Sequence, residues 1–247
     1  MKFKFFKFLD NAFTDALFPP DITCDLCGRD VFDKSNFCAD CAKKVKFNNG
    51  VVCPVCGRKT VRDEICIECK DNAPLYKKAA SPLVYEDGAI QLVAKYKNGY
   101  AYLKEYFADL ICGELKTFPK FDAIVYVPMT KKAKFKRGYN QSELLAKSIS
   151  KRTGVNVIDK AITKIKDTPE QKSLSRKERE ANLAGCFKVE NYEKVKGLSL
   201  LLVDDVLTTG ATADAVTRKL LRAGAVCVYL VTVASVEYKP KNKNVKP

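Results

Sequence analysis

The sequence LLLVDDVLTTGAT, residues 200–212, joins an apolar run to two adjacent carboxylates and a loop of small residues. The apolar run predicts a buried strand of a parallel sheet, and ligands of open α/β sheets bind where such strands end. Asp204 and Asp205 can accept hydrogen bonds from two vicinal hydroxyls. The loop, with the positive end of a helix expected from about Thr212, can hold a phosphate. The stretch therefore predicts a site for a phosphorylated ribose.

A strand followed by an Asx-type turn and a helix N-cap would explain one Asp and one Thr, but not both pairs in series. The whole stretch resembles the phosphoribosyl-pyrophosphate (PRPP) motif of type I phosphoribosyltransferases. The resemblance implies that the acidic pair holds the ribose 2′ and 3′ hydroxyls and that the loop holds the 5′-phosphate. The residues that it assigns to PRPP are Asp204, Asp205, Thr208, Thr209, Gly210, Ala211 and Thr212.

Four C-x-x-C pairs lie in the first third of the chain, at Cys24 and Cys27, Cys38 and Cys41, Cys53 and Cys56, and Cys66 and Cys69. Eight thiolates make two tetrahedral sites. A closed four-sulfur shell suits a structural zinc ion, because it leaves no open position for chemistry. Gly28 and Gly57 follow their pairs and let the chain turn its N–H groups toward the sulfurs. The spacing predicts two structural zinc sites.

Other uses of these cysteines are less well matched by the sequence. A disulfide framework belongs to short secreted chains, and the chain shows no secretory signal. An iron–sulfur cluster needs the same thiolates, and spacing alone does not separate it from zinc. Sequential pairing would make two short ribbons, whereas interleaved pairing would make a cross-brace. Both pairings are compatible with the sequence.

Composition narrows the chemistry further. The chain has 247 residues, 47% of them hydrophobic, which is enough for two domains with a real core. It contains no histidine, so no metal ligand, triad or general base uses imidazole. The formal charge of +15 would fall to about +11 with two zinc ions on eight thiolates. Such a field favours nucleotides, pyrophosphate or nucleic acid, although lysines spread along the whole chain are equally typical of compositional bias.

Periodicity from about residue 76 onward predicts an α/β fold. Helical patterns cover residues 89–115, with a break near 98–99, then 143–152, and a segment that ends before Gly224. Strand patterns cover residues 122–127, 155–158, 200–206 and 226–234. This alternation predicts βαβ units and a parallel sheet. The sequence has no P-loop and no G-x-G-x-x-G, which argues against kinases, NTPases and dinucleotide-binding enzymes.

These patterns divide the chain into four parts. Residues 1–20 form an amphipathic leader that packs against the zinc domain or contacts a membrane or partner, and no apolar run approaches membrane-spanning length. Residues 21–73 form the double zinc ribbon and 76–238 the α/β domain. Residues 239–247 form a basic tail that is predicted to be disordered. Without a secretory signal, we expect a cytoplasmic protein.

Further motifs indicate one family. They are V-P-M-T at residues 127–130, R-G-Y-N-Q at 137–141 and Q-x-x-L-x-R-x-x-R-x-x-N at 171–182. Together with the cysteine pairs and the PRPP motif, in this order, they resemble the ComF family over roughly residues 20–236. That family is associated with natural competence and DNA uptake. The resemblance implies a type I phosphoribosyltransferase-like parallel sheet with flanking helices, preceded by a small cysteine-rich zinc ribbon domain.

The resemblance also implies a mechanism, in which Mg²⁺ bridges pyrophosphate and ribose oxygens while a nucleophile displaces pyrophosphate. Asp204 and Asp205 would act in catalysis as well as binding. Arg137 and one of Lys172, Arg176 or Arg179 would clamp the leaving group, with Arg176 as the chosen candidate. The alternative for 176–179 is a solvated helix face with Glu178 and Glu180. The pyrophosphate loop would be lined by Met129, Thr130 and Lys131.

The acceptor of a phosphoribosyl transfer cannot be read from this sequence, so catalysis itself stays open. The leading hypothesis is a protein that binds Mg-PRPP and, partly through its zinc ribbons, single-stranded DNA or a competence partner such as a helicase. A location at the membrane, beside the DNA-uptake machinery, would follow from such a partner. The alternatives are a non-catalytic PRPP sensor or scaffold, and a nucleobase-salvage phosphoribosyltransferase.

Overall fold

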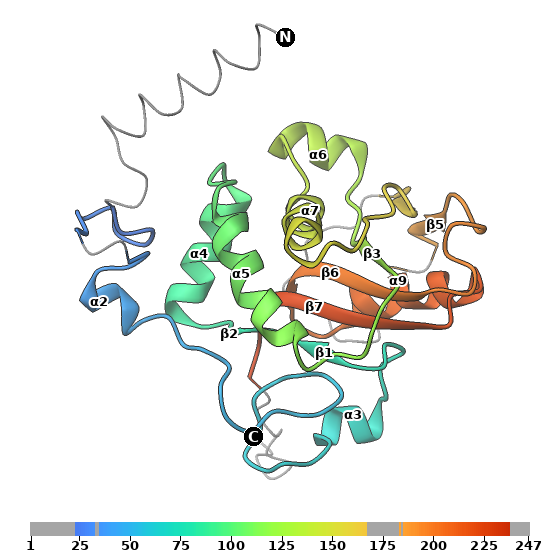
Figure 1. The fold of residues 1–247 in the computed structure, drawn as a ribbon, viewed down its shortest axis with the longest axis horizontal. Coiled ribbons are helices and arrows are strands. Elements are labelled where there is room, and N and C mark those ends of the chain that lie inside the picture. Colours follow the sequence, from blue (N-terminus) through green and yellow to red (C-terminus); the bar gives the residue numbers. More distant parts are fainter. Residues whose placement is uncertain (1–22, 33–34, 167–182, 184, 238–247) are drawn as a thin grey trace, which may run out of the picture.

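The computed structural model describes residues 23–32, 35–166, 183 and 185–237 (Figure 1). The predicted leader 1–20 and tail 239–247 lie outside the described residues, and so does Arg176. Among the described residues, none of the helices combines the length and the apolar character needed to cross a bilayer.

A five-stranded parallel sheet forms the centre of the molecule (Figure 1). Its strands are β1 (Ala79–Ala80), β2 (Leu83–Val84), β3 (Ala123–Tyr126), β6 (Ser199–Leu207) and β7 (Cys227–Ser235). The order is β1-β7-β6-β3, and β2 continues beside β7. In register, Leu202 of β6 lies between Val125 of β3 and Leu230 of β7. β3 and β6 are parallel, so the residues that follow them lie at the same end of the sheet, the end where the strands have their carboxyl termini. We call this end the site edge of the sheet.

Helices cover both faces of the sheet. On one face lie α4 (Asp87–Lys97), α5 (Leu103–Leu115) and α7 (Gln141–Thr153), and on the other lies α9 (Ala211–Arg222). The side chains of β6 alternate between the two cores: Leu201 and Val203 pack with the α5 side, and Leu200 and Leu202 with the α9 side. All four are fully buried, which explains why β6 reads as a continuous apolar run.

The smaller elements complete the fold. Two short helices, α2 (Ala39–Ala42) and α3 (Ile67–Asp71), each begin directly after a cysteine. α6 (Lys131–Arg137) follows the β3 edge of the sheet. An antiparallel pair, β4 (Ile162–Lys164) and β5 (Phe187–Val189), stands apart from the main sheet and was not predicted from the sequence.

The α/β fold class is confirmed, and the elements differ from expectation in detail. The break predicted near 98–99 is confirmed, since α4 ends at Lys97 and α5 follows from Leu103, whereas α4 begins two residues earlier than predicted. The predicted helix 143–152 begins earlier, because the Asn140 side chain caps it by accepting the Ser142 N–H at 3.1 Å. The strand predicted at 155–158 was wrong. Its only ladder contact in the described structure is a bridge from Val157 to Ile124, at the open edge of the sheet.

Both cysteine-rich segments are built onto the sheet and its helices. In the first, Leu26 and Val31 belong to the same buried cluster as α4 and α5, and Lys95 of α4 donates to the Leu26 carbonyl at 3.0 Å. In the second, the Ala79 N–H of β1 donates to the Val55 carbonyl at 2.8 Å. The cysteine-rich part therefore shares its hydrophobic core and backbone hydrogen bonds with the α/β part.

Candidate functional site

The cysteines form two clusters in sequential order. The Sγ atoms within each cluster all lie within 4.8 Å of one another. Sequential pairing, one of the two arrangements left open by the sequence, is therefore the one adopted, and the interleaved cross-brace is wrong. The first cluster consists of Cys24, Cys27, Cys38 and Cys41, and the second of Cys53, Cys56, Cys66 and Cys69.

The geometry of both clusters fits a tetrahedral ion. The Sγ atoms of Cys27 and Cys38 are 3.8 Å apart, and those of Cys56 and Cys66 are 3.7 Å apart. A tetrahedron with metal–sulfur bonds of about 2.3 Å has edges of about 3.8 Å. Such a cage holds one ion and is too small for a cluster of several irons. Both sites therefore fit the zinc ions of a double zinc ribbon.

Each cluster has a sulfur that accepts a hydrogen bond, which favours its thiolate form. Arg29 Nε donates to the Cys27 Sγ at 3.4 Å, and this hydrogen bond lowers the pKa of Cys27 to about 6. The Cys66 N–H donates to the Cys53 Sγ, also at 3.4 Å. Gly28 and Gly57 have φ angles of 76° and 66°, the left-handed conformation that the sharp turn after each pair requires.

The acidic pair lies near the carboxyl end of β6, where the two carboxylates have different partners. Asp204 Oδ1 accepts from the Ser142 hydroxyl at 3.0 Å and from the Asp205 N–H at 2.9 Å. Desolvation, together with the neighbouring Asp205 charge, raises the pKa of Asp204 to about 7. Asp204 is thus poised between its neutral and charged forms near neutral pH.

Lys97, the last residue of α4, forms an ion pair with Asp205 at 2.8 Å. Burial by itself lowers the pKa of Lys97, but the Asp205 carboxylate outweighs burial and raises it overall. Sequence reasoning missed this residue, because a lysine at a helix end gives no sign of which sheet edge it faces. The sequence reasoning also missed Ser142, although it lies next to the R-G-Y-N-Q motif.

The small-residue loop makes the turn from β6 into α9. Gly210 has a φ of 81° and precedes the first residue of α9, Ala211. The Thr209 hydroxyl accepts from the Ala211 N–H at 3.4 Å. The positive end of a 12-residue helix therefore adjoins the loop, as an anion site requires.

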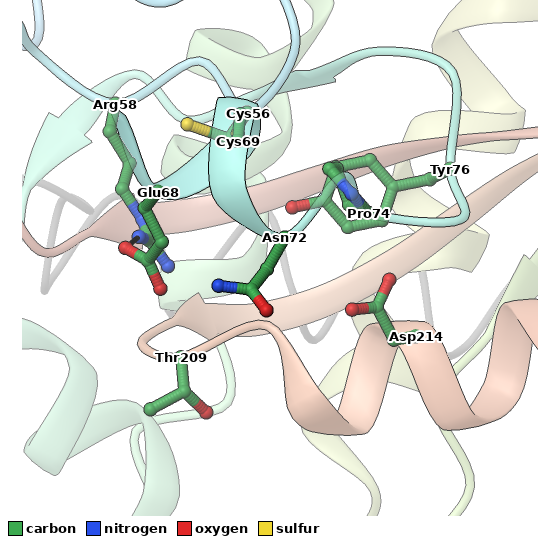
Figure 2. Close-up of a pocket in the computed structure, with 9 residues that line it drawn as sticks. All are labelled: Cys56, Arg58, Glu68, Cys69, Asn72, Pro74, Tyr76, Thr209 and Asp214. Carbon is green, nitrogen blue, oxygen red and sulfur yellow. Dashed lines mark hydrogen bonds and ion pairs between the residues drawn. The ribbon is translucent and has the colours of Figure 1, made fainter. Parts of the chain in front are cut away.

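The second cysteine-rich segment contacts this loop directly. Arg58, two residues after Cys56, is only 4% exposed. Its Nη2 donates to the Thr208 carbonyl, and its Nη1 donates to Glu68 of α3. Figure 2 shows Arg58 and Glu68 side by side above the loop that carries Thr209, beside a pocket at this junction. The pocket is lined by Cys56, Arg58, Glu68, Cys69, Asn72, Pro74, Tyr76, Thr209 and Asp214.

The loop that follows β3 meets the acidic pair from the neighbouring strand. Thr130 caps α6 by accepting the Ala133 N–H at 3.2 Å, so Met129 precedes the cap and Lys131 is the first residue of the helix. Arg137 Nη1 donates to Gln141 Oε1 at 3.1 Å, and the next residue, Ser142, donates to Asp204. Residues 129–131 and the acidic pair thus lie on or after neighbouring parallel strands, and Arg137 is linked to Asp204 through the adjacent residues Gln141 and Ser142.

Comparisons with known proteins agree with this two-part organisation. Residues 13–70 match the model of a double zinc ribbon domain, and residues 136–246 match that of a phosphoribosyl transferase domain. The DNA utilization protein YhgH of Salmonella typhi is 30% identical over 199 residues, covering 77% of this chain and 86% of the relative. The competence protein ComFC of Bacillus subtilis is 27% identical over 196 residues, covering 76% of this chain and 78% of the relative. The chain belongs to the ComF family.

The ComF-family assignment accounts for both halves of the chain, a double zinc ribbon and a phosphoribosyltransferase domain. One similar solved structure is adenine phosphoribosyltransferase from Thermoanaerobacter pseudethanolicus. It is 17% identical, covers 66% of this chain and 92% of that chain, and has a TM-score of 0.37. A likeness of this size carries nothing about activity or ligand.

Proposed function

We propose that this ComF-family protein binds PRPP with Mg²⁺ at the edge of the sheet where β3 and β6 end. The observation that carries the proposal is the position of Asp204 and Asp205 near the carboxyl end of β6, which leads through a turn with Gly210 into α9. Two carboxylates suit the ribose 2′ and 3′ hydroxyls. The loop of residues 208–212 and the positive end of α9 suit the 5′-phosphate.

Other residues at this edge have the chemistry that a pyrophosphate group needs. Lys131 and Arg137 are cations at the two ends of α6, beside Met129 and Thr130. Lys97, released from Asp205 when ribose binds, supplies a further charge. Mg²⁺, when bound, would neutralise the pyrophosphate oxygens and so favour departure of that group. Arg176 is proposed as an additional clamp from the segment outside the described residues.

Gln141 supplies a separate indication of a ligand. Its side chain is buried, and its Nε2 has no hydrogen-bond partner in the described part of the structure. A buried donor without a partner costs about 1–3 kcal/mol. An oxygen of a bound ligand beside Arg137 and Ser142 would recover this cost.

We further propose that the protein serves DNA uptake, binding single-stranded DNA or a competence partner such as a helicase partly through its zinc ribbons. The relatives are named for competence and for DNA utilization, and the chain carries a formal charge of +15. The corresponding location is the cytoplasm, with recruitment to the membrane at the uptake machinery.

A non-catalytic PRPP sensor is the alternative that one observation favours. Arg58 joins the second cysteine-rich segment, with Cys53 to Cys69, to the Thr208 carbonyl. The conformation of the loop proposed for phosphate, residues 208–212, is therefore coupled to this second ribbon. Release of pyrophosphate on adding nucleobases, ammonia, glutamine or DNA to the PRPP-bound protein separates the possibilities. Turnover with one free base supports a salvage transferase. Tight PRPP binding without release under any of these conditions supports the sensor.

Calorimetric titration of the zinc-loaded protein with PRPP and Mg²⁺ tests the site itself. We expect binding by the native protein and none by Asp204→Asn, because the amide retains the size of the carboxyl group but not its charge. The matched control is Asp63→Asn, which alters an exposed carboxyl in the second ribbon. Zinc content should be the same in all three proteins. PRPP binding retained in Asp204→Asn would refute the assignment of the site.

A further inference from the structure

The helix α6, with the sequence KKAKFKR, has no buried residue. Most helices in proteins owe their stability to an apolar face packed on the core. α6 is held instead by its two ends, since Thr130 caps the first turn and Gly138, with a φ of 86°, ends the last. It lies beside α7, at the end of the sheet where β3 leads into it (Figure 1).

Phe135 is 92% exposed, more than any other large hydrophobic side chain in the described part of the chain. An aromatic ring in this position contributes almost nothing to the free energy of folding, because it buries almost no apolar area. A single exposed apolar residue is ordinary in itself. Its neighbours on the helix make this one unusual.

The residues beside Phe135 on the helix surface are cations. Positions i, i+3 and i+4 share a face of an α-helix, so Lys132, Phe135 and Lys136 lie together. All three are exposed. On the other side, Lys134 pairs with Glu143 at 2.6 Å and Arg137 donates to Gln141, which fixes that side toward α7. The free side of α6 therefore presents an aromatic ring flanked by two ammonium groups, and we call it the Phe135 face.

We propose that the Phe135 face is a contact surface for single-stranded DNA, with an unpaired base stacked on Phe135 and adjacent phosphates at Lys132 and Lys136. This inference rests on the DNA-binding part of the proposed function and places that binding on α6 as well as on the zinc ribbons. Every base has a face that stacks on an aromatic ring, and lysines track the phosphate backbone without reading sequence.

The composition of α6 favours a single strand over a membrane or a protein groove. Insertion into a membrane or a groove needs an apolar stripe over several turns. α6 is seven residues long, and its only apolar residues are Ala133 and Phe135. The Phe135 ring can stack on one base while Lys132 and Lys136, which lie beside it, contact the adjacent phosphates. The bound DNA strand would lie beside the loop proposed for pyrophosphate, because Thr130 of that loop immediately precedes α6.

Fluorescence anisotropy with the full-length zinc-loaded protein and a labelled oligothymidine tests this inference. The first variant is Phe135→Ala, and the second combines Lys132→Gln with Lys136→Gln. Matched controls are Tyr192→Ala, and Lys194→Gln combined with Lys196→Gln. These three residues are exposed and lie shortly before β6 begins. They are therefore at the amino end of the strands, opposite to the end that carries α6. PRPP titration and circular dichroism verify that each variant is folded.

We expect Phe135→Ala to weaken binding of oligothymidine by about fivefold or more, as loss of a stacked base does. Binding of a matched duplex should hardly change, because its bases are already stacked on one another. The double lysine variant should reduce the slope of log affinity against log salt by about 1.4, because each single-strand phosphate contact contributes about 0.7. The control variants should bind as the native protein does.

Three results would overturn the inference. If the native protein binds oligothymidine and both α6 variants bind it equally well, the DNA contact lies on the ribbons and the proposed function survives without α6. If the native protein binds no DNA but does bind PRPP, the DNA part of the proposed function fails and this inference with it. If Phe135→Ala impairs only the binding of phosphatidylglycerol vesicles, α6 contacts a membrane.

Discussion

Asp204 and Asp205 are adjacent in sequence, yet their surroundings give them different properties. Asp205 is neutralised by Lys97, whereas Asp204 receives two hydrogen bonds from neutral donors, the Ser142 hydroxyl and a backbone N–H. Two like charges beside each other in a desolvated site raise the pKa of the one without a cation partner. The charge of Asp204 therefore changes near neutral pH.

PRPP affinity should increase as pH rises through about 7, where Asp204 loses its proton. The ionised carboxylate accepts hydrogen bonds from the ribose hydroxyls better than the neutral acid does. Titration calorimetry one pH unit below and one above this value measures the change. PRPP titrates too, so a pH titration of free PRPP with Mg²⁺ defines the contribution of the ligand. Asp30→Asn, which alters an exposed carboxyl in the first ribbon, should keep the pH dependence of the native protein. If the PRPP affinity of the native protein changes with pH only as the titration of PRPP itself predicts, Asp204 stays ionised throughout.

The same pKa has the opposite effect on the stability of the unliganded protein. Because the pKa of Asp204 is raised above its unfolded value, the folded state binds more protons between about pH 4 and pH 7. The free energy of unfolding contributed by this group therefore falls as pH rises through that window. Urea unfolding of the native protein and Asp204→Asn should reveal it, because the variant lacks this contribution. Parallel pH profiles for the two proteins would contradict the shift.

Gly28 and Gly57 occupy equivalent positions after their cysteine pairs but face different surroundings. A Cβ on Gly57 would lie 2.3 Å from the Ala79 carbonyl oxygen of β1, whereas a Cβ on Gly28 would meet nothing within 4 Å. Both have positive φ, so Gly28→Ala should lower the free energy of unfolding by about 1 kcal/mol. Gly57→Ala should cost roughly 2 kcal/mol more, because the ribbon must move away from β1. Equal losses in urea unfolding would show that the second ribbon does not approach β1 this closely.

At the scale of the elements, side-chain hydrogen bonds join the second ribbon to the β6–α9 turn. Arg58 is anchored by Glu68 of α3 and reaches the Thr208 carbonyl. On the other side of the turn, the Leu75 N–H donates to Asp214 of α9 at 2.9 Å. The loop proposed for phosphate is thus held at both ends by the segment that carries the second cysteine cluster.

Arg58→Leu should weaken PRPP binding roughly tenfold, because a charged hydrogen bond of about 1.5 kcal/mol or more no longer orders the loop. The matched control is Arg29→Leu, at the same position of the first ribbon. Arg29 is exposed, and its partners are Cys27 and Asp40 rather than the phosphate loop. PRPP titration and zinc analysis of both variants make the comparison. Equal PRPP affinity in the two variants, with zinc retained, would show that Arg58 does not support the loop.

At the scale of the whole molecule, the first cysteine-rich segment shares one hydrophobic core with the α/β part. Cys24 and Leu26 lie in one buried cluster with Tyr96 and Phe107. Two independently stable units joined by a linker would not share such a core. Zinc at the first site would fix Cys24 and Cys41 of this core. The second cysteine cluster is a small buried cluster of its own, joined to β1 by the Ala79–Val55 hydrogen bond. Zinc should therefore stabilise the α/β part as well as the ribbons.

Removal of zinc should lower the melting temperature of the α/β part as well as that of the ribbons. All 11 tyrosines lie at or after Tyr76, so the thermal transition seen by near-ultraviolet circular dichroism of tyrosine follows unfolding of the α/β part. We expect its transition to shift down by several degrees in the presence of a chelator, since about 1 kcal/mol shifts the melting temperature of a domain this size by 2–4 °C. An unchanged tyrosine transition after loss of zinc would show that the two parts unfold independently.

The sequence by itself determined the cysteine ligands, the parallel sheet and the placement of the acidic pair beside a phosphate-type loop. Each depends on spacing along the chain: C-x-x-C pairs, continuous apolar strands, and a motif of 13 consecutive residues. Family membership followed from the order of such motifs. The roles assigned to the PRPP residues stay predictions, since they concern a ligand rather than the fold.

Only the tertiary structure decided how these parts meet. It selected sequential cysteine pairing, joined Lys97 to Asp205 and Ser142 to Asp204, and placed Arg58 against the Thr208 carbonyl. It also reduced the predicted strand at 155–158 to a single bridge. The interactions of Lys97, Ser142 and Arg58 join residues far apart in the chain. Local periodicity reports which face of an element is buried, but not which distant element covers it, because that depends on packing of the whole core.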